Sequence, residues 1–165
     1  MADTVLRYVR GTKYVKNLPK APEGGNAKPA HGLVGELWVG GLCFDTLERM
    51  DGYVKMEGDQ DYANSTMYWH SKYKSYVVNP YLGREAEATK KKNILMHPAA
   101  VPSHLEGCVG IGFLESGKLT TSRESFTLIW KTVGGGVGNT SQILTVTLRV
   151  EGKMPSLATC TAWAG

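Results

Sequence analysis

Two apolar runs near the start of the chain meet at a pair of glycines, Gly40 and Gly41. The first run covers residues 33–39 and the second covers residues 42–47. A two-residue turn between paired strands requires positive φ values, which glycine adopts at little steric cost. The pattern therefore predicts a β-hairpin, and it is the strongest single constraint on how the chain can fold.

Further short runs rich in apolar, β-branched or aromatic residues recur along the chain, with turn-forming residues between them. They cover residues 5–9, 53–56, 66–78, 94–97, 109–113 and 142–150. Many short strands separated by turns are typical of an antiparallel β-sandwich or barrel. We leave open whether residues 66–78 form one long strand or two short ones.

One helix is predicted at residues 122–133. Thr121 and Glu124 have the spacing of a capping box, and Phe126, Ile129 and Trp130 recur at helical intervals that predict burial on one face. The predicted fold class is therefore mainly β (a β-rich α+β domain), an antiparallel sandwich or barrel-like domain with one main helix.

The N-terminal region has a different composition. Residues 11–32 carry three of the seven prolines and four glycines, with almost no apolar period. Such a composition is typical of an extended arm or linker. We therefore divide the chain into an arm at residues 1–32 and a single β-rich domain at residues 33–165, and we expect the arm to contact another chain.

The overall composition narrows the classes of partner and cofactor. The chain has 165 residues, 42% of them hydrophobic, and a net charge of +4 that comes partly from the run Lys90, Lys91 and Lys92. This run is more typical of a solvated turn than of a nucleic-acid-binding stripe, so no nucleic-acid partner is expected. The three cysteines are widely spaced and no paired metal-ligand motif occurs, so neither a disulfide framework nor a metal or other cofactor is expected. No apolar run suits a signal peptide or a membrane span, so we expect synthesis in a cytoplasm without membrane insertion.

The segment whose residues are best suited to catalysis runs from His97 to Cys108. Two apolar runs flank a proline-containing loop, so two strand ends could bring the imidazole and the thiol together, with Gly107 allowing a tight turn before the thiol. A thiol nucleophile needs such a base beside it. The alternative is that Cys108 is an inert filler of the core.

Three other loop residues accompany this pair. His104 is a second candidate base, or a solvated histidine. Ser103 either caps the turn or donates a hydrogen bond to a substrate, and Glu106 either orients an imidazole or is solvated.

Two other stretches carry weaker signals. Residues 134–138 are glycine-rich but follow the predicted helix and lack a Lys-Ser/Thr pair, which indicates a linker rather than a phosphate-binding loop. The aromatic residues Tyr62, Tyr68, Trp69, Tyr73 and Tyr76 form either a sheet or interface core or a sugar-stacking surface.

The His-to-Cys segment resembles a family of small phage and prophage proteins of unassigned function, catalogued as DUF5675. Those proteins carry a pattern like I-H-x-G-N-x-P-x-D-T-x-G-C-I, which is similar to residues 94–109 here. Residues 35–48 resemble the opening hairpin of that family, and residues 122–126 resemble its helix start. The resemblance covers roughly residues 33–133.

That pattern is in turn similar to the active-site signature of L,D-transpeptidases, which use a cysteine and a histidine to remodel peptidoglycan peptides. The resemblance implies that Cys108 is the nucleophile and His97 the base. This chain departs from the signature at three places: Pro98 follows the histidine in place of glycine, the loop is two residues longer, and Gly110 stands where an arginine is usual. It also departs from the phage pattern, with Ala100 in place of asparagine and His104-Leu105 in place of Asp-Thr.

Two hypotheses follow. The first is a virion-associated protein whose L,D-transpeptidase-like Cys/His domain acts on peptidoglycan peptides. The second is a purely structural virion component of the tail, baseplate or head, which contacts other virion proteins or copies of itself through the arm. An accessible thiol beside the imidazole in an open cleft favours chemistry, whereas a sulfur enclosed by side chains favours the structural role.

Overall fold

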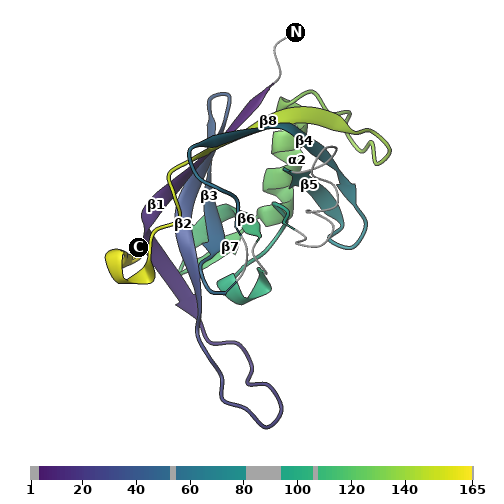
Figure 1. Cartoon of the computed structure of the whole chain (residues 1–165). Coiled ribbons are helices and arrows are strands. Elements are labelled where there is room, and N and C mark those ends of the chain that lie inside the picture. The colour runs from purple at the N-terminus through teal and green to yellow at the C-terminus, as the bar shows by residue number, and fades with distance from the viewer. Residues whose placement is uncertain (1–3, 53–54, 81–93, 106–107, 165) are drawn as a thin grey trace.

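The computed structural model describes residues 4–52, 55–80, 94–105 and 108–164. Within them the chain is mainly β, and its antiparallel-rich sheet curls into a half-barrel (Figure 1). The described strands are β1 (Val5–Asn17), β2 (Ala30–Val39), β3 (Leu42–Arg49), β4 (Gln60–His70), β5 (Ser75–Asn79), β6 (Val109–Glu115), β7 (Lys118–Thr120), β8 (Leu144–Glu151) and β9 (Thr161–Ala162). The helical elements are α2 (Ser122–Thr132) and two short 3₁₀ turns, η1 (Pro102–His104) and η2 (Leu157–Thr159).

The strands follow one another around the curl in the order β5-β4-β8-β1-β2-β3-β6-β7, with β9 added beside β1. Neighbours pair antiparallel except at β1, which runs parallel to β8 and to β9. The predicted hairpin is confirmed as β2 and β3, whose turn places Gly40 at φ 58°. Residues 66–78 belong to two strands, β4 and β5, and the final predicted strand corresponds to β8. The predicted strand at residues 53–56 lies partly outside the described residues.

A short segment centred on Met96 links the two ends of the curl. Met96 exchanges backbone hydrogen bonds of 2.9 and 3.1 Å with Val78 of β5. On its other side, Val109 of β6 donates to Leu95 O and accepts from His97 N, both at 3.0 Å. Residues 94–97 therefore bridge β5 to β6 and complete the ring of backbone pairing. The sequence run that was predicted as an ordinary strand makes isolated bridges instead.

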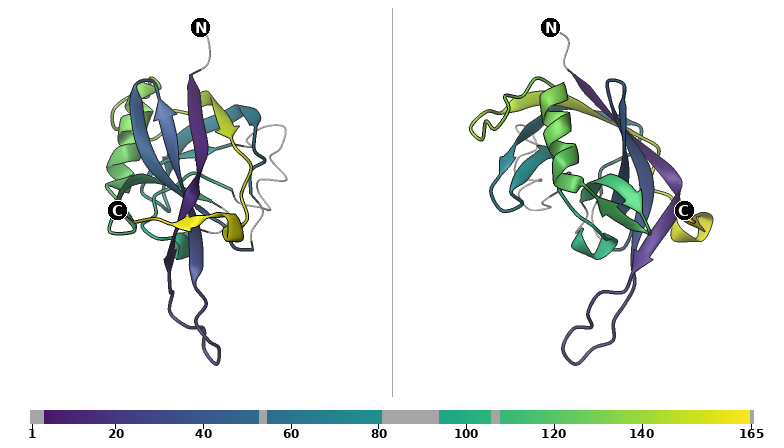
Figure 2. Two further views of the ribbon diagram at one scale, coloured as in Figure 1. Left: turned by 90° about the vertical axis from the view of Figure 1, so that its left-hand side faces the viewer. Right: turned by 180° about the vertical axis from the view of Figure 1, so that it is seen from behind.

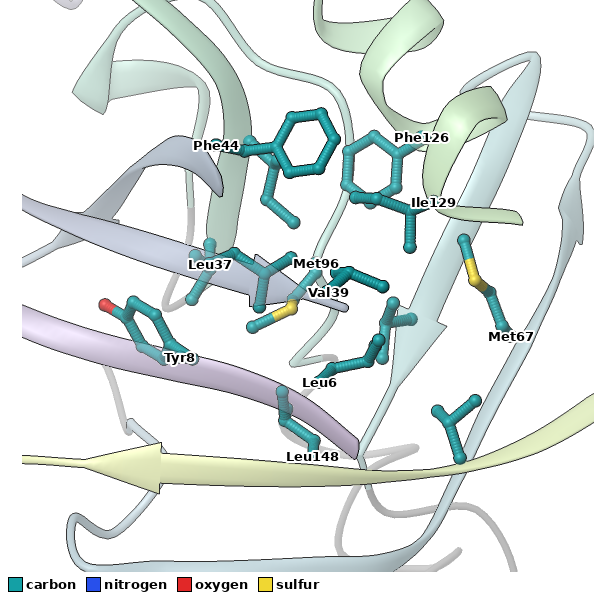
Figure 3. Close-up of a cluster of buried hydrophobic side chains, with 14 of the residues drawn as sticks. Leu6, Tyr8, Leu37, Val39, Phe44, Met67, Met96, Phe126, Ile129 and Leu148 are labelled. Carbon is teal, nitrogen blue, oxygen red and sulfur yellow. The ribbon is translucent and has the colours of Figure 1, made fainter. Parts of the chain in front are cut away.

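The main core fills the inside of this curl and is closed by α2 (Figure 3). Phe126, Ile129 and Trp130 of the helix are fully buried there, which confirms the predicted helix and its buried face. The predicted capping box is wrong. Thr121 has a left-handed backbone (φ 52°) and makes no side-chain cap. At the other end Gly134, at φ 101°, follows the helix as expected for a C-terminal stop.

The predicted N-terminal arm is wrong for the residues that form β1. This strand lies between β8 and β2 in the sheet, and its pairing with β2 runs to Asn17 and Ala30. Only the connecting residues 18–29 match the description of an extended segment, and they project from the body as a long loop (Figures 1 and 2). The sequence predicted a strand only at residues 5–9. Its continuation to Asn17 was missed because the next buried position is a charged residue, Arg10.

Arg10 forms a buried ion pair with Glu48 of β3. Its Nε and Nη2 donate to the two carboxylate oxygens at 2.8 and 2.9 Å, and both side chains are almost completely excluded from solvent. The Tyr8 hydroxyl donates to Glu48 at 2.6 Å, while Arg10 also donates to the carbonyls of Met56 and Gly152. Burial and the adjacent carboxylate raise the Tyr8 pKa well above its ordinary value. A charged pair can lie in this core because hydrogen bonds satisfy both partners.

Candidate functional site

His97 and Cys108 lie on adjacent segments, as predicted. The bridge between Met96 and Val109 is parallel, and both of these residues point into the main core. Leu95 and Cys108, their preceding neighbours, belong together to a second cluster of buried side chains. Because successive side chains alternate across extended backbone, His97 faces the same side as Leu95 and Cys108. The two candidate catalytic residues therefore share one face of the sheet, diagonally across the bridge.

The thiol lies within an apolar environment. Cys108 is only 3% exposed. The second cluster, which we call the Cys108 cluster, consists of Val15, Leu47, Leu95, Ala99, Leu105, Cys108 and Leu119. A buried thiol among apolar side chains behaves as a small hydrophobe and reacts slowly. In this conformation the surroundings of Cys108 match the structural interpretation rather than those of an exposed nucleophile.

The imidazole of His97 is also buried, at 3% exposure. Its Nδ1 lies 2.9 Å from Pro98 O, and because a carbonyl only accepts, Nδ1 carries the proton and Nε2 is left as the basic nitrogen. Burial is the largest cause that lowers the His97 pKa, and the nearby Lys72, His70 and His104 lower it further against the opposing Pro98 hydrogen bond. A neutral imidazole is the form that can accept a proton, but it supplies no standing positive charge to hold a thiolate.

The remaining predicted site residues do not converge on this pair. Ser103 exchanges two hydrogen bonds of 2.8 and 2.9 Å with Asn17, so it ties η1 to β1. No described hydrogen bond of its side chain caps the turn, and a hydrogen bond to a substrate stays a prediction. His104 follows it in η1 and lines a surface cleft. Glu106 and Gly107 lie outside the described residues.

The cleft that His104 lines lies beside the start of α2 and has a volume of about 440 Å³. Its other lining residues are Pro98, Ala99, Ala100, Leu119, Thr121, Ser122, Arg123 and Glu124. Ala99 and Leu119 also belong to the Cys108 cluster, so the same two side chains border both the cleft and the surroundings of the thiol.

Two residues at this site, Tyr73 and Arg123, were not linked to His97 and Cys108 in the sequence, where Tyr73 was considered only as part of the aromatic set. The Tyr73 ring stacks on His97 with centroids 4.2 Å apart and planes 12° apart. Arg123, which lines the cleft, donates from Nε to Tyr73 O at 3.0 Å. No local sequence pattern linked Arg123 of α2 to the segment that carries His97 and Cys108.

The other aromatic residues of the sequence cluster divide between two environments. Tyr62 and Tyr76 are buried in the main core, where Tyr76 stacks on Trp130 at 4.3 Å. This supports the sheet-core interpretation for these two. Nearer to the site, His70 lies 4.9 Å from the Tyr73 ring, and its Nδ1 is buried without a hydrogen-bond partner in the described part of the chain.

Across residues 4–52, 55–80, 94–105 and 108–164, no group of three or more His, Cys, Asp and Glu side chains is placed to hold a metal ion. All three cysteines are described and none is in a disulfide. Burial and a hydrogen bond to Glu36 raise the pKa of Cys43 to about 11.

Comparison with protein-family models, with curated proteins and with solved structures gives no match. The described part of the chain contains no helix with the length and apolar character needed to cross a membrane.

Proposed function

We propose that this chain is a structural component of a bacteriophage virion, in its tail, baseplate or head. The resemblance of the His-to-Cys segment to phage and prophage proteins supports the virion assignment. One observation favours the structural role over catalysis: Cys108 and His97 are each only 3% exposed. In this role the two side chains fill part of the interior of a barrel-like scaffold. The protein then acts as a part of the virion.

The loop between β1 and β2 suits contacts with other virion proteins or with copies of the same chain. Residues 18–29 project from the body, and the exposed set includes Leu18 (66% exposed), Lys20 and Lys28. Replacing this loop by a two-residue Asn-Gly turn should leave the barrel folded and weaken assembly. Light scattering of the purified chain and incorporation into particles would measure the loss; unchanged assembly would count against this role for the loop.

The structural proposal is tested through the thiol. Purified protein is treated with iodoacetamide at neutral pH, and each cysteine is followed by peptide mass spectrometry. Cys108 should be labelled only slowly until the protein is denatured. In parallel, incubation with peptidoglycan fragments should give the same products for the native chain and for Cys108→Ala. A product that requires Cys108 would overturn the structural proposal.

A thiol acyl-transferase or peptidase acting on peptidoglycan peptides is the second candidate, favoured by the shared face of His97 and Cys108. In that reaction the Cys108 sulfur attacks a peptide carbonyl and forms a thioester. His97 accepts the thiol proton at Nε2 and delivers it to the departing amine. An acceptor amine or water then cleaves the thioester and restores the thiol. Arg123 at the cleft would supply the cation that the chain lacks at Gly110.

A further inference from the structure

The turn between β4 and β5 covers the face that His97 and Cys108 share. It consists of residues 71–74, of which Ser71, Lys72 and Lys74 are exposed while Tyr73 is half-buried. Lys74 adopts a left-handed backbone with φ 50°, which an L residue other than glycine rarely does. The turn is thus a short surface element that directs one aromatic side chain inward.

That one side chain contacts His97 and the cluster that contains Cys108. The Tyr73 ring lies flat on the His97 imidazole at 4.2 Å and also packs against the Cys108 cluster. A ring in this position separates the shared face from solvent on the side of the turn. Without it, the imidazole would lose its stacked cover and the cluster would lose one of its bordering side chains.

Three described contacts hold this turn in place. Arg123 donates to Tyr73 O, the His70 ring lies 4.9 Å from Tyr73, and the Lys72 ammonium lies 5.4 Å from the same ring. The ladder between β4 and β5 pairs His70 with Ser75, just outside the turn. The turn can therefore move away from His97 while the two strands stay paired.

We propose that Tyr73 is a lid residue, and that movement of residues 71–74 opens the face shared by His97 and Cys108. The opened face would join the cleft beside α2, because Ala99 and Leu119 border both. The lid goes beyond the structural role proposed above, and it holds whether or not the opened site performs chemistry.

The test is the rate at which iodoacetamide labels Cys108 in three variants, read by peptide mass spectrometry. Tyr73→Ala removes the ring and should speed labelling on the order of tenfold, since an aromatic stack contributes about one factor of ten in an equilibrium. Tyr73→Phe keeps the ring and should label like the native chain. Tyr68→Ala is the matched control, because Tyr68 contacts His70 on the same hairpin but has no described stack on His97.

Two outcomes would overturn the lid. One is a native Cys108 that is labelled as fast as an unfolded thiol. The other is a Tyr73→Ala rate that is unchanged, or matched by Tyr68→Ala. General destabilisation is recognised separately, because it would accelerate Cys43 and Cys160 as well and lower the melting temperature.

Incubating Tyr73→Ala with peptidoglycan fragments separates the lid from the proposed function. Faster labelling without any Cys108-dependent product supports the lid and leaves the structural role in place. Faster labelling with such a product supports the lid and overturns the structural role.

Discussion

The buried ion pair between Arg10 and Glu48 provides the sharpest test of how the barrel is stabilised. Replacing Arg10 by methionine keeps much of the side-chain volume but removes the donors to both carboxylate oxygens and to two backbone carbonyls. Glu48, with a fully buried side chain, would then keep only the hydrogen bond from Tyr8 among those described. Breaking one partner of a buried pair costs about 3–5 kcal/mol of unfolding free energy, since a charge is left without compensation.

Urea unfolding followed by circular dichroism measures this cost. With a slope of about 2 kcal/mol per molar urea, a loss of about 4 kcal/mol lowers the midpoint by about 2 M. The double variant Arg10→Met with Glu48→Leu should be more stable than Arg10→Met alone, because it removes the stranded charge. A single variant that costs less than about 1 kcal/mol, or a double variant that loses the sum of both changes, would refute this reasoning.

Three further predictions concern pH, thiol reactivity and packing. The pKa of His97 is lowered in the folded chain from the ordinary histidine value of about 6.5. As the pH falls toward and below that value, the unfolded chain therefore binds more protons than the folded chain. The urea midpoint should therefore fall as pH drops from about 7.5 to about 5.5, and less steeply in His97→Phe; an equal slope in both would contradict it. Cys43, with its pKa raised to about 11, should be alkylated on the order of tenfold more slowly at pH 8 than a thiol of pKa 9, and Glu36→Gln should speed it, as followed by mass spectrometry. Gly35→Ala should lower the free energy of unfolding, measured in urea, by about 1–3 kcal/mol. The added Cβ would lie 2.6 Å from Val9 O and 2.8 Å from Thr46 Oγ1. Gly41→Ala is the control and should not lower it, because its Cβ meets no atom within 4 Å.

The elements that could be predicted from sequence are those whose signals are local. Gly40 and Gly41 between two apolar runs specified the β2–β3 hairpin, and the spacing of Phe126, Ile129 and Trp130 specified the buried face of α2. Only residues 5–9 of the N-terminal strand were predicted. Its continuation to Asn17 was missed because the alternation includes Arg10, whose burial depends on Glu48 in another strand. A charged residue gives no local sign that its partner will be present.

The candidate site could likewise be predicted only in part from the sequence. The approach of His97 to Cys108 could be expected, because the loop between them is short. The two segments run parallel, however, so the chain does not reverse between them as the sequence had suggested. The enclosure of both side chains could not, because Tyr73 comes from a different hairpin and Arg123 from the helix. These contacts depend on how the sheet curls, which no single segment encodes.

The bridge at residues 94–97 also affects how the molecule behaves in a crowded solution. A strand at the end of a sheet exposes unpaired N–H and C=O groups that can recruit a strand from another molecule and begin aggregation. In this chain Met96 already occupies that position beside β5, through its two hydrogen bonds to Val78. The segment that carries His97 therefore also shields the β5 edge from association with another strand. A change that detaches it would expose an aggregation-prone edge as well as disturb the site.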